Sequence, residues 1–246
     1  MSSQNQACGA IVLAAGKGTR MRSDLPKPLV SVAGKPMIHH LCDSIEQAGM
    51  GPIAVVVGHG AEQMRSSLGS EIHTPLQEVQ DGTASAVEFG KSSVETVSDV
   101  FVSVGDSPLI RSETLTELLV HHRQTGAACT FLTAHFERHY PYGRVLRDAE
   151  GVVTGCVEER SATEEQKKIQ EYITSHYLFD AEALWRHLPE IQAHPDSGER
   201  YLTDIIAILI ESGQRVETLV IDDWRELVGL NTPEDVEWAE AQLKVR

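Results

Sequence analysis

The residues best suited to chemistry lie in one loop near the start of the chain, LAAGKGTRMRSDLPKPL, which covers positions 13–29. Glycines at such a turn let backbone N–H groups approach an anion, and basic side chains add positive charge. The loop contributes two glycines and three bases of this kind: Gly16, Gly18, Lys17, Arg20 and Lys27. It predicts a phosphate-binding site, although glycines after a strand also fit a simple turn.

Two familiar phosphate loops do not fit this segment. A dinucleotide fingerprint G-x-G-x-x-G needs glycine at the position of Met21, and a P-loop needs Ser or Thr at the position of Gly18. The position of Lys27 is more specific, because prolines on both sides restrict its backbone. Its ammonium group is therefore expected to point at a ligand.

Charge is distributed unevenly along the 246 residues, whose formal net charge is −15. The first 35 residues carry five bases and one acid, whereas the rest carries 16 bases and 35 acids. An acidic chain lacks the positive footprint that nucleic acids and anionic membranes require, so we expect neither as a partner. A basic segment on an acidic body indicates a local anion site instead.

Apolar runs and helical periodicities alternate through the first half of the chain. Short apolar runs that end in turns are typical of buried parallel strands, and the segments between them have helical spacing. The predicted strands are 9–15, 52–58, 99–106 and 127–134, and the predicted helices are 36–49, 61–68, 83–96 and 112–126. This order predicts an α/β fold, a Rossmann-like, mainly parallel sheet with helices on both faces.

The second half of the chain has sequence patterns that are typical of antiparallel strands. We expect a hairpin over 142–159 with its turn at 148–151, and a further strand over 172–180. Helices are expected at 181–188, 201–212 and 233–243. We interpret residues 1–246 as a single domain, with a nucleotide-binding half at about 9–135 and a β-rich, sugar-binding insertion at about 136–246.

Cysteine usage and the first residues indicate the compartment. The 4 cysteines are far apart and form no C-x-x-C pair, which favours small apolar side chains in a reducing environment. The opening MSSQNQACGA has neither a basic n-region nor an apolar h-region, and no apolar run approaches the length of a bilayer span. We expect a cytoplasmic protein; the sequence predicts no oligomeric state.

The loop and six later segments together resemble a known family. The string G-x-G-T-R-(x)n-P-K is similar to the signature of the sugar-phosphate nucleotidyltransferases, and most closely to the uridyltransferase domain of bacterial bifunctional N-acetylglucosamine-1-phosphate uridyltransferases. The further matches, in family order, are LQEVQDGTASA, VGDSPLI, YGRV, VEERSATEEQKKIQE, GERYLTD and GLNTPED. The bifunctional members continue into an acetyltransferase of hexapeptide repeats, and we expect no such activity in these 246 residues.

The resemblance implies that UTP and N-acetylglucosamine 1-phosphate react to give UDP-N-acetylglucosamine and pyrophosphate. The attacking phosphate is already ionised at neutral pH, because the second pKa of a phosphomonoester is about 6. No general base is needed. Because two polyanions must meet, cations and Mg²⁺ are the appropriate catalysts.

The resemblance also implies a role for individual residues. Arg20 and Lys17 would hold the β and γ phosphates, Lys27 the α-phosphate or sugar phosphate, and Asp106 and Asn231 the Mg²⁺. Taken alone, Asp106 would equally fit a helix N-cap and Asn231 a turn. The implied nucleotide-binding residues are Leu13, Ala14, Ala15, Gly16, Gly18, Thr19, Gln77, Gly82 and Thr83, and the implied sugar-binding residues are Gly105, Gly143, Glu158, Ile173 and Thr174.

Two positions depart from the family pattern on the sugar side. Val104 stands where the family has Tyr, and Ile173 stands where it has Asn. Loss of a polar contact can change substrate preference by orders of magnitude. Alternative functions are therefore the same reaction on another sugar 1-phosphate such as glucose 1-phosphate, transfer to a non-sugar alcohol phosphate, and a non-catalytic nucleotide-binding regulator. Glu158, beside another glutamate, also fits a solvated hairpin edge.

Overall fold

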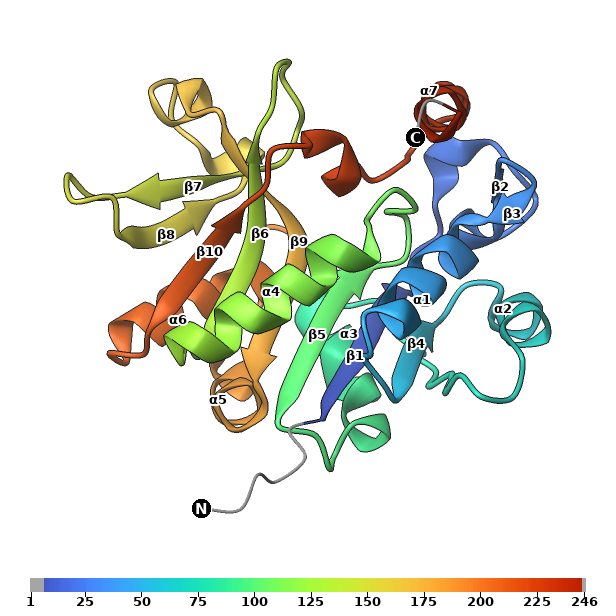
Figure 1. Ribbon diagram of the computed structural model, residues 1–246, viewed down its shortest axis with the longest axis horizontal. Coiled ribbons are helices and arrows are strands. Elements are labelled where there is room, and N and C mark those ends of the chain that lie inside the picture. The colour runs from blue at the N-terminus through green and yellow to red at the C-terminus, as the bar shows by residue number, and fades with distance from the viewer. Residues whose placement is uncertain (1–6, 245–246) are drawn as a thin grey trace.

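The structure, a computed structural model, describes residues 7–244 and has a mixed sheet at its centre (Figure 1). The strand order is β10-β6-β9-β5-β1-β4, and the hairpin β7–β8 joins the sheet at β9. β1 is parallel to β4 and β5, and β10 is parallel to β6, whereas β9 is antiparallel to both neighbours. The strands are β1 (Cys8–Ala14), β4 (Ile53–Val57), β5 (Asp99–Val104), β6 (Cys129–His135), β7 (Gly143–Arg147), β8 (Val153–Val157), β9 (Glu171–Asp180) and β10 (Val216–Val220), with β2 (Ser31–Val32) and β3 (Lys35–Pro36) in a separate small sheet.

Helices cover both faces of the sheet, as the α/β prediction requires. The apolar side chains of β1 alternate between two buried clusters: Ala10 and Val12 belong to one, Ile11 to the other. The first cluster includes residues of α1 (Met37–Gln47), α2 (Ala61–Leu68), α4 (Ser112–Thr125) and α7 (Pro233–Leu243). The second includes residues of α3 (Thr83–Gly90), α5 (Ala181–His187) and α6 (Ile205–Glu211). The predicted fold class is confirmed.

Most predicted elements are present, with shifts that have a physical reason. The helix predicted over 83–96 is α-helical only to Gly90 and continues as the 3₁₀-helix Lys91–Ser93. A Cβ on Gly90 would lie 2.7 Å from Ile11 Cγ2, so the end of α3 packs directly on β1. The helix predicted over 201–212 likewise begins with a 3₁₀ turn before α6. Strand β10 was not predicted, because its five residues follow α6 without an extended apolar run.

The irregular strand β9 shapes the sheet beside the site. It pairs with β5 only as far as the partners Val102 and Tyr177, and its register against β6 shifts between Phe131 and Thr133. Ser175 lies within this irregularity with a φ of 62°, a left-handed conformation uncommon for residues other than glycine. The carboxyl end of β5 is consequently left without a β9 partner, and its last residues pair only with β1.

None of the helices between residues 7 and 244 is long and apolar enough to cross a membrane. The four cysteines are free thiols, three of them buried. Burial raises the pKa of Cys8 and of Cys42 to about 12, which keeps both thiols protonated and unreactive near neutral pH.

A buried carboxylate ties the segment before α7 to the start of α4. Glu226, in the 3₁₀-helix Trp224–Leu227, is 1% exposed. It accepts hydrogen bonds from the Arg111 backbone N–H (3.0 Å), the Arg111 guanidinium and the Thr114 hydroxyl (2.7 Å). These contacts fix the chain that leads to Asn231 against the loop that follows Asp106.

We expect Glu226→Ala to lower the free energy of unfolding by about 2–4 kcal/mol, because it leaves the Thr114 hydroxyl and the Arg111 amide without an acceptor. Urea denaturation measures this change. The control is Glu217→Ala, which removes a carboxylate from an exposed pair with Arg215 and should cost no more than about 0.5 kcal/mol. Equal losses for the two variants would contradict the role given to Glu226.

Candidate active site

A cavity of about 360 Å³ lies at the carboxyl ends of β1 and β5, where open α/β sheets bind ligands. Thirteen of the site residues predicted from the sequence line this cavity: eight predicted to bind nucleotide, the phosphate-binding bases Arg20 and Lys27, the sugar-binding Gly105, and both metal ligands. They are Leu13, Ala14, Ala15, Gly16, Gly18, Arg20, Lys27, Gln77, Gly82, Thr83, Gly105, Asp106 and Asn231. The fold therefore brings together segments that are far apart in the sequence.

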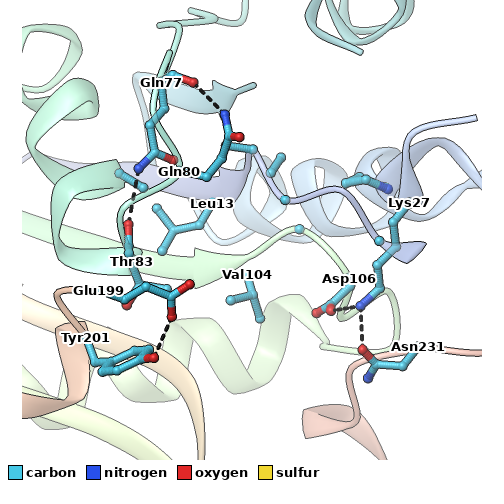
Figure 2. A pocket seen from close by; sticks show the side chains of 18 of the residues that line it. Leu13, Lys27, Gln77, Gln80, Thr83, Val104, Asp106, Glu199, Tyr201 and Asn231 are labelled. Atoms are coloured by element: carbon cyan, nitrogen blue, oxygen red, sulfur yellow. Dashed lines mark hydrogen bonds and ion pairs between the residues drawn. The ribbon is translucent and has the colours of Figure 1, made fainter. Parts of the chain in front are cut away.

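The glycine loop positions Lys27 at the cavity. Gly18 has a φ of 57°, and a Cβ there would collide with the side chain of Lys27. Any other residue at position 18 would meet both the steric cost of this conformation and that collision. Lys27 begins the 3₁₀-helix Lys27–Leu29, so its backbone is fixed, and its long side chain extends to Asp106 (Figure 2).

The two predicted metal ligands meet two of the three predicted cations, Lys27 and Arg20, at one end of the cavity. Figure 2 shows Lys27 between Asp106 and Asn231. The Lys27 ammonium pairs with Asp106 Oδ2 and donates to Asn231 Oδ1 at 2.8 Å. Arg20 Nη2 donates to the same Asn231 oxygen at 2.7 Å. The side chains of Lys27 and Asp106 are 13% and 20% exposed, so this contact is largely shielded from water.

Backbone contacts hold both ligand residues in place. The Leu230 N–H donates to the Asp106 carbonyl at 2.9 Å, which joins the two segments directly. The Asn231 N–H donates to Asp235 Oδ2 at 2.7 Å, and its side-chain Nδ2 donates to the Gly229 carbonyl at 2.9 Å. Asn231 therefore directs its amide oxygen toward Lys27. Asp235 also forms the capping box that starts α7 with Thr232.

This pair of oxygens fits a divalent cation. Asp106 Oδ1 is buried and has no hydrogen-bond partner within residues 7–244. Carboxylate and amide oxygens are ligands that Mg²⁺ accepts while it keeps several waters. A buried carboxylate oxygen without a donor is costly unless a cation uses it, so Asp106 and Asn231 are the residues suited to hold a metal.

The other end of the cavity presents a side-chain amide. Gln77 is 2% exposed, and its Nε2 donates to the Gly82 carbonyl at 3.2 Å. The Thr83 hydroxyl accepts from the Leu202 N–H at 2.8 Å, which fixes α3 against the segment after residue 198. Around them the wall is apolar, with Leu13, Ala86 and Val104 facing the space.

The cavity also includes residues to which no role was assigned from the sequence. Glu199 and Tyr201 line it from the second half of the chain, and Tyr201 Oη donates to Glu199 Oε2 at 2.5 Å. Their segment is held by Arg200, whose N–H donates to the Asp81 carbonyl at 2.9 Å and whose carbonyl accepts from the Ala84 N–H at 3.0 Å. Both residues lie in the motif GERYLTD, so the sequence contained a pattern that could have predicted their place in the site. Gln80, Pro28 and Val104 complete the lining.

Six predicted site residues do not line the cavity: Lys17, Thr19, Gly143, Glu158, Ile173 and Thr174. Lys17 and Thr19 are exposed on the glycine loop. Among the four predicted sugar-binding residues, Gly143 and Ile173 pack closely, because a Cβ on Gly143 would lie 2.8 Å from Ile173 Cγ2. Ile173 is 3% and Thr174 6% exposed, and Glu158 Oε1 accepts from the Thr203 hydroxyl at 3.0 Å. Their sugar-binding role stays a prediction.

Comparison with known proteins places this arrangement in a family. Residues 10–208 match the family described as MobA-like NTP transferase domain. The chain belongs to this family. It is 44% identical over 96% of its length to the bifunctional protein GlmU of Heliobacterium modesticaldum and 43% identical over 90% to that of Enterococcus faecalis. The chain spans about half of these relatives, 52% and 49% of their lengths respectively. The resemblance seen in the sequence is confirmed. The cavity is therefore interpreted as the active site of a nucleotidyltransferase.

A buried histidine stands on β9 near the metal-ligand end. His176 is fully buried, its Nδ1 donates to the Thr174 carbonyl at 2.7 Å, and its Nε2 has no partner within the described residues. Burial lowers its pKa to about 4, and the hydrogen bond to Thr174 and the negative charge of Asp106 oppose this shift only partly. The imidazole is therefore neutral in the folded protein at neutral pH.

This pKa predicts a pH-dependent loss of stability. An unfolded chain protonates His176 near its ordinary pKa of 6.5, whereas the folded chain does so only near 4. The stability is fully present above pH 6.5 and falls between pH 6.5 and 4, by up to about 1.4 kcal/mol per pH unit. We expect His176→Gln to show a smaller drop in unfolding free energy between pH 7.5 and 5 than the wild-type chain, measured in urea. Parallel curves for the two proteins would show that His176 is not buried and neutral.

Proposed function

We propose that this protein transfers a uridylyl group from UTP to N-acetylglucosamine 1-phosphate and releases pyrophosphate. The observation that carries the proposal is the group of Lys27, Arg20, Asp106 and Asn231 at one end of a cavity whose other end presents the Gln77 amide. Membership of the NTP transferase family and the similarity to bifunctional GlmU proteins support it.

The reaction requires charge stabilisation rather than proton transfer. A phosphate oxygen of the sugar phosphate attacks the α-phosphorus of UTP, and the bond from this phosphorus to the α,β-bridging oxygen breaks. The bonding electrons leave with pyrophosphate, so charge balances without a base. Lys27 and Arg20 would neutralise charge on the phosphate oxygens. The loop fixes the backbone of Lys27, so its side chain is already directed toward the reacting centre. Mg²⁺ held by Asp106 and Asn231 would supply Lewis-acid charge.

The Gln77 amide supports uracil as the base. Its Nε2 is committed to the Gly82 carbonyl, so the carbonyl oxygen Oε1 is the group left to accept a hydrogen bond from a ligand. The uracil imide offers an N–H donor, whereas cytosine has an acceptor at the same ring position. Apolar contacts from Leu13 and Ala86 suit the faces of a pyrimidine ring.

Two side chains in the cavity lining support a hydroxylated acceptor. Glu199 and Tyr201 present a carboxylate and a phenol that can bond sugar hydroxyls. Val104 lines the same cavity, in place of a polar residue in the family pattern. N-acetylglucosamine 1-phosphate remains our first choice because the matched relatives are GlmU proteins; glucose 1-phosphate, a non-sugar alcohol phosphate and loss of catalysis are alternatives that the test separates.

The test is a panel of acceptors assayed by pyrophosphate release in the presence of Mg²⁺ and UTP. We expect turnover with N-acetylglucosamine 1-phosphate to exceed turnover with glucose 1-phosphate and with phosphocholine. We expect CTP to replace UTP poorly because the ring nitrogen N3 of cytosine has no proton to donate to the Gln77 carbonyl oxygen. Faster turnover with another acceptor would replace the proposed substrate. Absence of pyrophosphate with every acceptor would favour the regulatory alternative.

Asp106→Asn should lower kcat by about 10²–10³, because a neutral amide holds Mg²⁺ less tightly than a carboxylate does, and the positive charge that the metal would supply to the transition state is then lost. Steady-state kinetics with thermal unfolding of the same samples measures this. The matched control is Asp43→Asn, since Asp43 pairs with Lys35 at the surface and lies outside the cavity lining. A loss shared by both variants, or none in Asp106→Asn, would contradict the catalytic role of Asp106.

A further inference from the structure

We propose that the Lys27 ammonium occupies the divalent-cation site of the free protein, so that the site accepts a metal ion together with a nucleoside triphosphate and not alone. This inference rests on the proposed function for the identity of the nucleotide. Lys27 would then have two roles: it competes with the metal ion in the free protein, and it binds phosphate when the nucleotide is present.

Both predicted metal ligands already hold a cation in the free protein. Lys27 contacts Asp106 Oδ2 and Asn231 Oδ1 at the same time, which are the oxygens suited to a metal. Asn231 Oδ1 also accepts from Arg20, so both of its lone pairs are in use. A metal ion that binds Asn231 must therefore displace Lys27 and Arg20 from this oxygen.

The contact between Lys27 and Asp106 is shielded from water. The Lys27 and Asp106 side chains are 13% and 20% exposed, so their attraction is weakened little by water. Lys27 enters from a backbone restricted by Pro26 and Pro28, and Gly18 allows its side chain to pack against the loop. The ammonium group is thus delivered to Asp106 by a rigid segment, which limits the entropy lost in forming the pair.

The positive charge of Lys27 and Arg20 also disfavours a metal ion at this site when no nucleotide is bound. A divalent ion on Asp106 and Asn231 would lie beside two cations, Lys27 and Arg20, and would share the Asp106 carboxylate with Lys27. A triphosphate reverses this balance, because its oxygens give Lys27 and Arg20 new partners and leave Asp106 and Asn231 to the metal. Metal and nucleotide should consequently strengthen each other's binding by the same factor.

Lys27 satisfies only one of the two carboxylate oxygens of Asp106. Its Oδ1 remains buried and without a hydrogen-bond partner within residues 7–244, although Oδ2 contacts Lys27. One ammonium group neutralises the carboxylate but uses one of its two oxygens. A metal with several waters can use the second oxygen as well.

The test measures Mn²⁺ binding to the full chain without nucleotide, by electron paramagnetic resonance of the free ion. We expect weak binding by the wild-type protein and at least about tenfold tighter binding by Lys27→Met, since removing the competing ammonium leaves Asp106 unpaired. Lys17→Met is the matched control, because it removes the same charge from an exposed position on the same loop and should leave the affinity within about threefold. Unchanged Mn²⁺ affinity in Lys27→Met would overturn the proposal.

Two further measurements keep the result specific. Combining Lys27→Met with Asp106→Asn should abolish the gain, and a gain that persists in the double variant would place the metal elsewhere and overturn the proposal. Lys27→Gln, with thermal unfolding of each variant, provides a second test that does not depend on the folding of Lys27→Met. It should show the same gain, and a lack of gain in a folded Lys27→Gln would overturn the proposal.

The proposed function is tested separately, by calorimetric titration of the wild-type protein with a UTP analogue whose α,β-bridge is a methylene group. Lack of binding would contradict the proposed function, while the metal affinities of the lysine variants would still decide the inference about Lys27. If the analogue binds, the Mn²⁺ affinity of the wild-type complex should rise at least about tenfold. Binding of the analogue without this rise would overturn the inference and leave the proposed function intact.

Discussion

The contact on which the site depends is the one between the Lys27 ammonium and the oxygens of Asp106 and Asn231. It joins a loop after β1, the end of β5 and the segment before α7, which are separated by up to 204 residues in the chain. Opposite charges shielded from water attract strongly only when their geometry is fixed. Three sets of hydrogen bonds fix that geometry. The Leu230 N–H donates to the Asp106 carbonyl, Glu226 accepts from Arg111 and Thr114, and Asp235 accepts from the Asn231 N–H. Much of the surrounding structure therefore holds the residues of this contact in place.

The cavity lies where the pairing between β5 and β9 is interrupted. Because β9 leaves β5 after Val102 and passes through the left-handed residue Ser175, the end of β5 can present Val104 and Asp106 to a ligand. The segment around Glu199 and Tyr201 then closes the other side through backbone bonds to Asp81 and Ala84. A regular strand at β9 would continue the ladder along β5. The irregularity in the sheet therefore belongs to the construction of the site.

Local patterns predicted the elements well and their arrangement less well. The helix predicted over 233–243 is observed with the same bounds, because Thr232 and Pro233 mark its start strongly. Strand β10 and the break of α3 at Gly90 depend on tertiary packing against β6 and Ile11, which no local pattern contains. In the site, the motifs located Lys27, Asp106 and Asn231, but the mutual contact of these residues and the participation of Glu199 required the fold. Ile173 appears in a motif, but it is 3% exposed and is not among the residues that line the cavity, since motif order gives position in the chain and not orientation.

The central claim is that Asp106 and Asn231 exchange an ammonium partner for a metal ion when a nucleotide is bound. The most direct measurement is a crystal structure of the protein with Mn²⁺ and the methylene analogue of UTP, with anomalous scattering recorded for manganese. The account predicts a manganese peak bonded to Asp106 and Asn231, and the Lys27 ammonium bonded to a phosphate oxygen. A manganese peak away from these two residues, or a Lys27 still paired with Asp106 beside a bound nucleotide, would contradict it.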